Sequence, residues 1–178
     1  MSTSQPIDFV KESSDAVQTR LSTGLNWGAN AVSVFISGVF LDSLRFKFTN
    51  APKTQVIFGD LDALAATYGA QGLFAPTGLF SQYVIGSSEL VASIVLVAAT
   101  FTPRLRFLRP AAAALSLAIM TGAISFHLLT PLGINVAGDG GALFYTACGV
   151  WIGALALLLG RRSERRDLLQ RLSNLLAR

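Results

Sequence analysis

The chain has 178 residues, of which 52% are hydrophobic and 13% are charged, and its formal net charge is +4. Soluble domains carry about 25% charged residues, so this composition argues against a soluble fold and favours a polytopic membrane protein. The basic excess does not indicate nucleic-acid binding, because the arginines flank apolar segments, where they set topology and contact lipid. A single cysteine, Cys148, and a single histidine exclude a disulfide, a CxxC dithiol centre and bis-histidine haem within one chain.

The first 24 residues are polar and charged, with no short apolar region before a small-residue cleavage site. We therefore expect no cleavable signal peptide, and residues 1–24 are predicted to form a cytoplasmic N-terminal segment. Four apolar stretches follow, each close to the ~20 residues that cross a ~30 Å hydrocarbon core as a helix. They are Leu25–Leu44, Leu79–Phe101, Leu108–Thr130 and Gly141–Leu159. The predicted fold is an all-α membrane protein, a four-transmembrane-helix bundle over residues 25–160.

Small residues are expected to bring the spans together, since helices in lipid associate through close backbone approach. Gly149 and Gly153 form a GxxxG pattern in the fourth span, and Gly24 and Gly28 form another at the start of the first. Intrachain packing is the expected use of the pair in the fourth span, with homodimerisation as the alternative. The small-residue stripe that continues the pattern in the first span consists of Ala29, Ser33 and Ser37.

The longest connection, from about Phe48 to Pro76, follows the first span. It contains apolar residues at helical spacing with two aspartates among them, which predicts a short amphipathic helix at the outer membrane interface. Two roles stay open for this loop: a structural cap on the bundle, or a lid over a cavity open to the external side. The apolar residues of the predicted helix are Val56, Ile57, Phe58, Leu61, Leu64 and Ala65.

Arginine is concentrated on one side of the predicted membrane. The link between the second and third spans and the tail 161–178 are rich in it, whereas the link Pro131–Gly140 has no basic residue. The positive-inside rule therefore places both termini in the cytoplasm. The tail is predicted to form a basic amphipathic helix that contacts anionic lipid or a partner protein. The residues assigned to lipid or partner contact are Arg104, Arg106, Arg109, Arg161, Arg162, Arg165 and Arg166.

Ionisable groups inside the membrane are candidates for function, because each costs about 2.5–3.5 kcal/mol on insertion scales. Glu89 lies in the middle of the second span, and His127 lies near the external end of the third. Two interpretations stay open: a buried cluster that locks the helices in register, or a site for a proton, a quinone or a small solute. The residues assigned to this candidate network are Asp42, Arg45, Lys47, Glu89 and His127, with Asp42 and Arg45 spaced to pair.

Other chemistry finds little support in the sequence. Glu89 and His127 alone supply too few ligands for a metal site. No nucleophile–base pair, phosphate-binding glycine loop or nucleic-acid motif is present, so no catalytic residue is assigned and an enzyme is not favoured. The Gly138–Gly141 stretch is interpreted as a turn in which Asp139 caps the N-terminus of the last span.

Four short stretches show a recognisable pattern, namely Leu44–Thr49, Gly86–Leu90, Ile124–Pro131 and Asp139–Phe144. They resemble the DoxX-like membrane proteins and the related family that includes the reactive-chlorine-resistance inner-membrane protein. The resemblance covers roughly Asn26 to Gly160 through short motifs. It implies a four-helix bundle in a bacterial inner membrane, and some relatives are associated with thiosulfate–quinone oxidoreduction or oxidative-stress complexes. Carried over by position, the family's polar residues would be Lys47, Glu89, His127 and Asp139, which adds Asp139 to the candidate network.

The role that follows from this resemblance is a non-catalytic subunit or a stress-related membrane protein beside a redox partner. The alternative is a quinone- or small-solute-binding membrane protein that uses Glu89 and His127.

Overall fold

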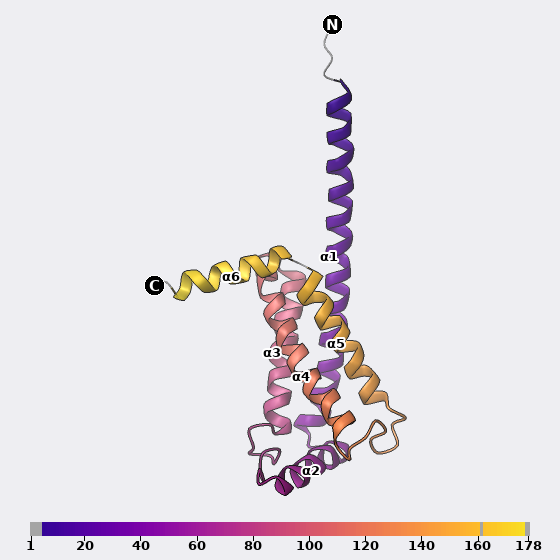
Figure 1. The fold of residues 1–178 in the computed structure, drawn as a ribbon, viewed down its shortest axis with the longest axis vertical. Coiled ribbons are helices and arrows are strands. Elements are labelled where there is room, and N and C mark those ends of the chain that lie inside the picture. The colour runs from indigo at the N-terminus through magenta and orange to yellow at the C-terminus, as the bar shows by residue number, and fades with distance from the viewer. Residues whose placement is uncertain (1–4, 161, 177–178) are drawn as a thin grey trace.

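The computed structural model describes residues 5–160 and 162–176, and it describes side chains at positions 17, 20 and 21 and from residue 23 onward. The regular secondary structure of these residues is entirely helical, with no strand among them, so the predicted all-α class is confirmed (Figure 1). The elements are α1 (Gln5–Phe48), α2 (Pro52–Thr67), α3 (Gln82–Phe101), the 3₁₀ helix η1 (Pro103–Leu108), α4 (Arg109–Leu129), α5 (Ala142–Gly160) and α6 (Arg162–Leu176).

Four segments of the described chain are long and apolar enough to cross a membrane, as the hydropathy pattern predicts. They belong to α1, α3, η1 with α4, and α5, and they cover Thr23–Phe48, Gln82–Phe101, Pro103–Leu129 and Ala142–Gly160. In the bundle α3 packs between α1 and α4, and α5 packs between α4 and α1 (Figure 1). The backbone of α1 is helical from Gln5, so no helix end marks the boundary predicted at residue 24.

Local chemistry explains where several of these helices begin. Pro52 starts α2 and Pro103 starts η1, positions where the missing N–H of proline costs no intrahelical hydrogen bond. The Oγ of Ser81 accepts a hydrogen bond from the N–H of Val84 at 3.3 Å, which satisfies one of the unpaired donors at the start of α3. The chain can therefore reverse direction within short links and return each span to the bundle.

The packing of α5 on α1 depends on glycine. A Cβ added at Gly153 would lie 3.0 Å from Cγ1 of Val32, and one added at Gly149 would lie 3.5 Å from Cζ of Phe35. The approach is tight at Gly153 and an ordinary contact at Gly149. Both glycines face α1, which confirms the predicted intrachain packing. The second GxxxG pattern behaves differently, because nothing described lies within 4 Å of a Cβ built at its two glycines.

The core of the bundle combines large apolar and small polar side chains. Phe40 of α1, Leu96 of α3 and Val150 of α5 are fully buried. The stripe of small residues in α1 that the sequence singles out is also buried, and Ser33 donates a hydrogen bond to its own helix at Ala29 O, 2.8 Å away. Small side chains with internally satisfied hydroxyls thus let neighbouring helices approach closely.

The loop that carries α2 closes one end of the bundle (Figure 1). Leu61 and Ala65 of α2 bury together with Phe74, whose ring meets that of Phe126 in α4 edge-on at a centroid distance of 5.3 Å. The carboxylate of Asp62 accepts a hydrogen bond from the backbone N–H of Phe74 at 3.0 Å. The short helix predicted in this loop is therefore present, and its contacts are those of a cap.

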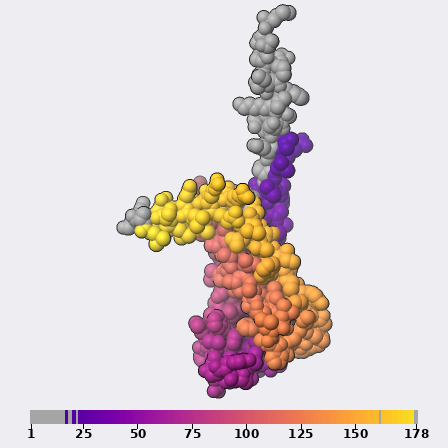
Figure 2. Space-filling view, in the orientation of Figure 1, coloured from indigo at the N-terminus to yellow at the C-terminus, as the bar shows by residue number. Residues whose placement is uncertain are grey.

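At the opposite end of the bundle, α6 turns away from α5 and projects to the side, and Figure 2 shows its C-terminal part extending beyond the bundle. It packs against η1 and the start of α4. A helix is therefore present in the C-terminal tail, as the sequence of residues 161–178 predicts. The leucines that it exposes are Leu169, Leu172, Leu175 and Leu176.

Candidate functional site

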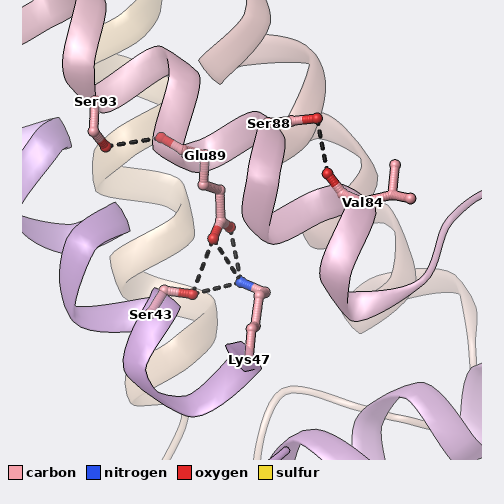
Figure 3. Close-up of polar contacts among 6 residues, drawn as sticks. All are labelled: Ser43, Lys47, Val84, Ser88, Glu89 and Ser93. Carbon is pink, nitrogen blue, oxygen red and sulfur yellow. Dashed lines mark hydrogen bonds and ion pairs between the residues drawn. The ribbon is translucent and has the colours of Figure 1, made fainter. Parts of the chain in front are cut away.

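A buried ion pair joins α1 to α3 and forms the centre of the candidate site (Figure 3). Nζ of Lys47 lies 2.8 Å from Oε1 and 2.9 Å from Oε2 of Glu89. Ser43 donates from its Oγ to Oε2 of Glu89 at 3.2 Å, and the ammonium of Lys47 also contacts that Oγ. Glu89 is 2% exposed and the side chain of Lys47 is 15% exposed. The structure thus brings together two of the residues that the sequence analysis assigns to one network.

The backbone around the pair explains its geometry. Lys47 lies in the last turn of α1, and Cβ atoms on a helix tilt toward its N-terminus, so the side chain reaches back to the level of Ser43. Gly86 lies one turn before Glu89 on α3, and a Cβ there would already sit 3.5 Å from the side chains of Leu44 and Lys47. That distance is an ordinary van der Waals contact, so Gly86 faces α1 beside the ammonium and the carboxylate without a forced approach.

A second residue of α3 fixes the end of α1 above the pair. The side-chain amide of Gln82 donates to the backbone oxygen of Lys47 at 3.0 Å and to Oδ1 of Asn50 at 2.9 Å. These bonds satisfy a carbonyl at the end of α1, where helix carbonyls lack an intrahelical partner. Gln82 is itself buried. Further down the same interface, Ser37 donates to the backbone oxygen of Ser93 at 3.4 Å.

The hydrogen-bond donors of Lys47 and the acceptors of Glu89 are largely satisfied by groups of the same chain. An ammonium has three donors, and here its oxygen neighbours are Ser43 and both carboxylate oxygens of Glu89. A buried charge is tolerated when it is paired and hydrogen-bonded, and removing one partner leaves the other uncompensated. A ligand at Glu89 would have to displace Lys47 or Ser43. The arrangement therefore favours a lock between α1 and α3 over an open binding site.

His127 lies elsewhere in the structure. Its Nδ1 is 2.6 Å from the backbone oxygen of Gly133, which can only accept, so Nδ1 carries the proton. Its ring meets that of Phe144 edge-on at a centroid distance of 5.7 Å. Among the described residues, His127 and Glu89 make no direct hydrogen bond or ion pair with each other, although the sequence places both in one network. His127 instead fastens the end of α4 to the following loop and to α5.

Asp139 holds the turn that opens α5. Its Oδ1 accepts hydrogen bonds from the N–H groups of Val136 and Gly141 at 3.0 and 2.9 Å, and Oδ2 accepts one from Leu143 at 3.1 Å. The predicted capping role is confirmed. Burial raises the pKa of the Asp139 carboxyl, but the three backbone donors and the ammonium of Lys53 outweigh it and hold the pKa below the ordinary value of 3.8.

Asp42 and Arg45 pair with each other on the surface. Their closest charged atoms are 2.9 Å apart, and their side chains are 61% and 66% exposed. An exposed pair three residues apart on a helix contributes little, about 0–1 kcal/mol. The six residues of the candidate network therefore separate into the Lys47–Glu89 pair, this surface pair, His127 and Asp139.

Arg109 departs from its sequence-based assignment. It was assigned to lipid or partner contact, but it is fully buried at the start of α4, so that prediction is wrong. Its Nη1 pairs with Oε1 of Glu164 at 3.1 Å, and its Nη2 donates to Oδ1 of Asn30 at 2.8 Å and to the backbone oxygen of Ala99 at 3.2 Å. The forked guanidinium can satisfy several acceptors at once, and here it links α1, α3, α4 and α6.

The other arginines assigned to lipid or partner contact differ in their surroundings. Arg165 is half-buried and donates to the backbone oxygen of Leu158 at 2.6 Å, near the C-terminal end of α5. Arg106 is also half-buried. Arg161 lies outside the described residues. The exposed members of the set are Arg104, Arg162 and Arg166.

Four polar partners are absent from the sequence-based assignment, namely Ser43, Gln82, Asn30 and Glu164. Ser43 stands four residues before Lys47, a spacing that places both on one helix face. Glu164 is the first acid in an arginine-rich segment, and this negative charge among arginines is the sequence feature that could have indicated an ion pair with an arginine of the same chain. Gln82 and Asn30 carry no such signal, since an amide near the end of a span looks the same whether it faces water or protein.

Neither a protein-family model, nor a curated protein, nor a solved structure matches this chain. The resemblance to DoxX-like proteins therefore stays a prediction, and the functional assignment depends on the geometry of the chain's own residues. Among the residues that the structure describes, no three His, Cys, Asp or Glu side chains are grouped so that they could hold a metal ion.

Glu89→Gln is expected to lower the free energy of unfolding by on the order of 3 kcal/mol, because the amide leaves the charge of Lys47 uncompensated inside the bundle. The matched control is Asp42→Asn, which breaks the exposed pair on α1. This variant should change the free energy of unfolding by less than about 1 kcal/mol. Thermal unfolding in mild detergent, followed by circular dichroism, measures both. Equal losses in the two variants would contradict a special role for the buried pair.

The lowered pKa of Asp139 predicts a pH-dependent contribution to stability. Because the folded-state pKa lies below the unfolded value, the contribution is fully present above about pH 3.8 and is lost as the pH falls through the folded-state pKa. Unfolding midpoints measured across this acidic range should converge for the unmodified chain and Asp139→Asn at the lowest pH. A difference between the two that stays constant with pH would refute the assignment.

Proposed function

We propose that this chain is a multi-pass protein of the bacterial inner membrane that acts as a non-catalytic subunit and holds a partner protein at its basic end. The observation that carries the proposal is the internal use of the bundle's buried charges: Glu89 is bound by Lys47 and Ser43, and Arg109 is bound by Glu164. Groups committed in this way stabilise a scaffold, whereas a reaction centre needs a group poised for an incoming substrate.

The orientation follows from the distribution of charge between the two ends. η1 and α6 lie together at one end, where Arg104, Arg162 and Arg166 are exposed. The positive-inside rule assigns this end to the cytoplasm, which puts both termini there. The other end has no such basic excess, since its acids offset its basic residues outside the Lys47–Glu89 pair: Asp42, Asp60, Asp62 and Asp139 against Arg45 and Lys53. In this orientation α2 lies at the outer interface and α6 lies along the cytoplasmic surface of the membrane.

Charge also indicates the partner. Exposed guanidinium groups on η1 and α6 favour a partner with an acidic surface, since complementary charge steers association and sets orientation. The resemblance to DoxX-like proteins adds that the partner is a redox protein or a stress-response complex. Gly149 and Gly153 of α5, the candidate residues for a homodimer, pack against α1, so a second copy would need another surface.

The alternative function is a quinone or small-solute site formed by Glu89 and His127. Its support is weaker, because these residues do not contact each other in the described chain and Lys47 already occupies the carboxylate of Glu89. A ligand would have to break a buried ion pair to bind there, at a cost of several kcal/mol.

The proposal predicts a stable complex in native membranes. Affinity purification of the full chain after extraction in mild detergent should recover a second protein in defined proportion. The double variant Arg104→Gln with Arg162→Gln should lower that recovery about tenfold, since two charge-assisted contacts to the partner are lost.

The matched control is Arg45→Gln, which removes one exposed positive charge at the opposite end and should leave recovery unchanged. Purification of this chain alone from membranes would contradict the subunit role. A chain that alkaline carbonate washes from the membrane fraction would contradict the membrane placement itself.

A further inference from the structure

A hollow of about 310 Å³ lies between α6 and η1, which pack against each other, and none of its lining residues belongs to the Lys47–Glu89 site. Four residues line it: Phe107 from η1, and Arg171, Asn174 and Leu175 from α6. An aromatic ring and a leucine supply apolar surface, while a guanidinium and an amide supply hydrogen-bond donors. The hollow therefore has one apolar part and one polar part within a few residues.

A cation–π contact joins α6 to η1. The guanidinium carbon of Arg171 lies 4.1 Å from the centre of the Phe107 ring. Stacking uses the flat face of a guanidinium and leaves its N–H edge for an oxygen ligand. Within the part of the chain described, Arg171 makes no hydrogen bond and no ion pair. Its charge is thus positioned by an aromatic contact but has no anionic partner from the protein.

The position of the hollow along the spans determines what can enter it. Phe107 stands two residues before α4, inside the apolar segment Pro103–Leu129 that is long enough to cross a membrane. The hollow therefore lies at the end of a span, where hydrocarbon meets the headgroups. Leu172 and Leu176 extend the exposed apolar surface of α6 beside it.

The charge around the hollow is strongly positive. η1 carries Arg104 and Arg106 in addition to the arginines of α6. The acids on α6 are Glu164, which is paired with Arg109, and Asp167. An anionic lipid is therefore favoured. Phosphatidylcholine carries the same phosphate, but its choline adds a positive charge that the surrounding arginines disfavour.

We propose that this hollow binds one anionic phospholipid, with its phosphate on Arg171 and Asn174 and its hydrocarbon against Phe107 and Leu175. The proposal depends on the membrane placement proposed above and goes beyond it by naming a discrete site. A bound lipid would bridge η1 and α6 and hold α6 against the cytoplasmic leaflet. An acidic protein segment would satisfy Arg171 but would not need the apolar surface at this depth.

The test is native mass spectrometry of the full chain, released from bilayer nanodiscs of phosphatidylcholine and phosphatidylglycerol in equal amounts. We expect one phosphatidylglycerol to be retained in preference to phosphatidylcholine. Arg171→Gln should lower that preference about tenfold, which corresponds to about 1.4 kcal/mol. Asn174→Ala should lower it in the same direction without changing the net charge of the chain.

The matched control is Arg166→Gln, which removes the same charge from an exposed position on α6 outside the hollow and should change the preference less than about twofold. Equal loss in the two arginine variants would overturn the site, because it would show only general attraction to a basic surface. Displacement by inorganic phosphate alone would overturn the assignment to lipid, and an acidic protein retained in place of lipid would do the same. A chain that stays in the membrane yet shows no lipid preference would overturn this inference and leave the proposed membrane placement intact.

Discussion

An ammonium and a carboxylate meeting between two apolar helices constrain the rest of this structure. Either charge alone would be costly in a bundle surrounded by hydrocarbon, so α1 and α3 gain most when Lys47 and Glu89 face each other. That requirement selects one antiparallel register of the two helices. The same register places Gln82 against the end of α1 and Gly86 against the side chains of Leu44 and Lys47.

The two helices are held again near their other ends. Arg109 reaches Asn30 on α1 and the backbone of α3, and its pairing with Glu164 attaches α6 to the bundle. Polar contacts at both ends of an apolar interface specify the register more strictly than packing of small residues alone. Between them lie small side chains that permit close contact, and Ser37 adds one hydrogen bond across the interface to the backbone oxygen of Ser93. The scaffold is thus fastened from within, while its exposed arginines remain at one end.

The sequence analysis predicts the four spans well, because membrane crossing depends on local hydropathy and length. It also identifies Glu89 as a costly residue and assigns both Lys47 and Arg45 to its network, without choosing between them; only Lys47 pairs with Glu89. The bond from His127 to the adjacent loop is not predicted, since it depends on how the chain turns back at Gly133 after α4. The burial of Arg109 is missed for a related reason: its carboxylate partner is 55 residues away in sequence, and only the fold of α6 brings it back.

A double-mutant cycle on the ion pair tests the central claim most directly. Free energies of unfolding in detergent would be compared for Lys47→Met, Glu89→Met and the double variant. If the pair fixes α1 on α3, each single variant loses on the order of 3 kcal/mol, and the double variant loses no more than either, because no uncompensated charge is left. Losses that simply add would contradict the account, since they would mean that the two charges stabilise the bundle independently of each other.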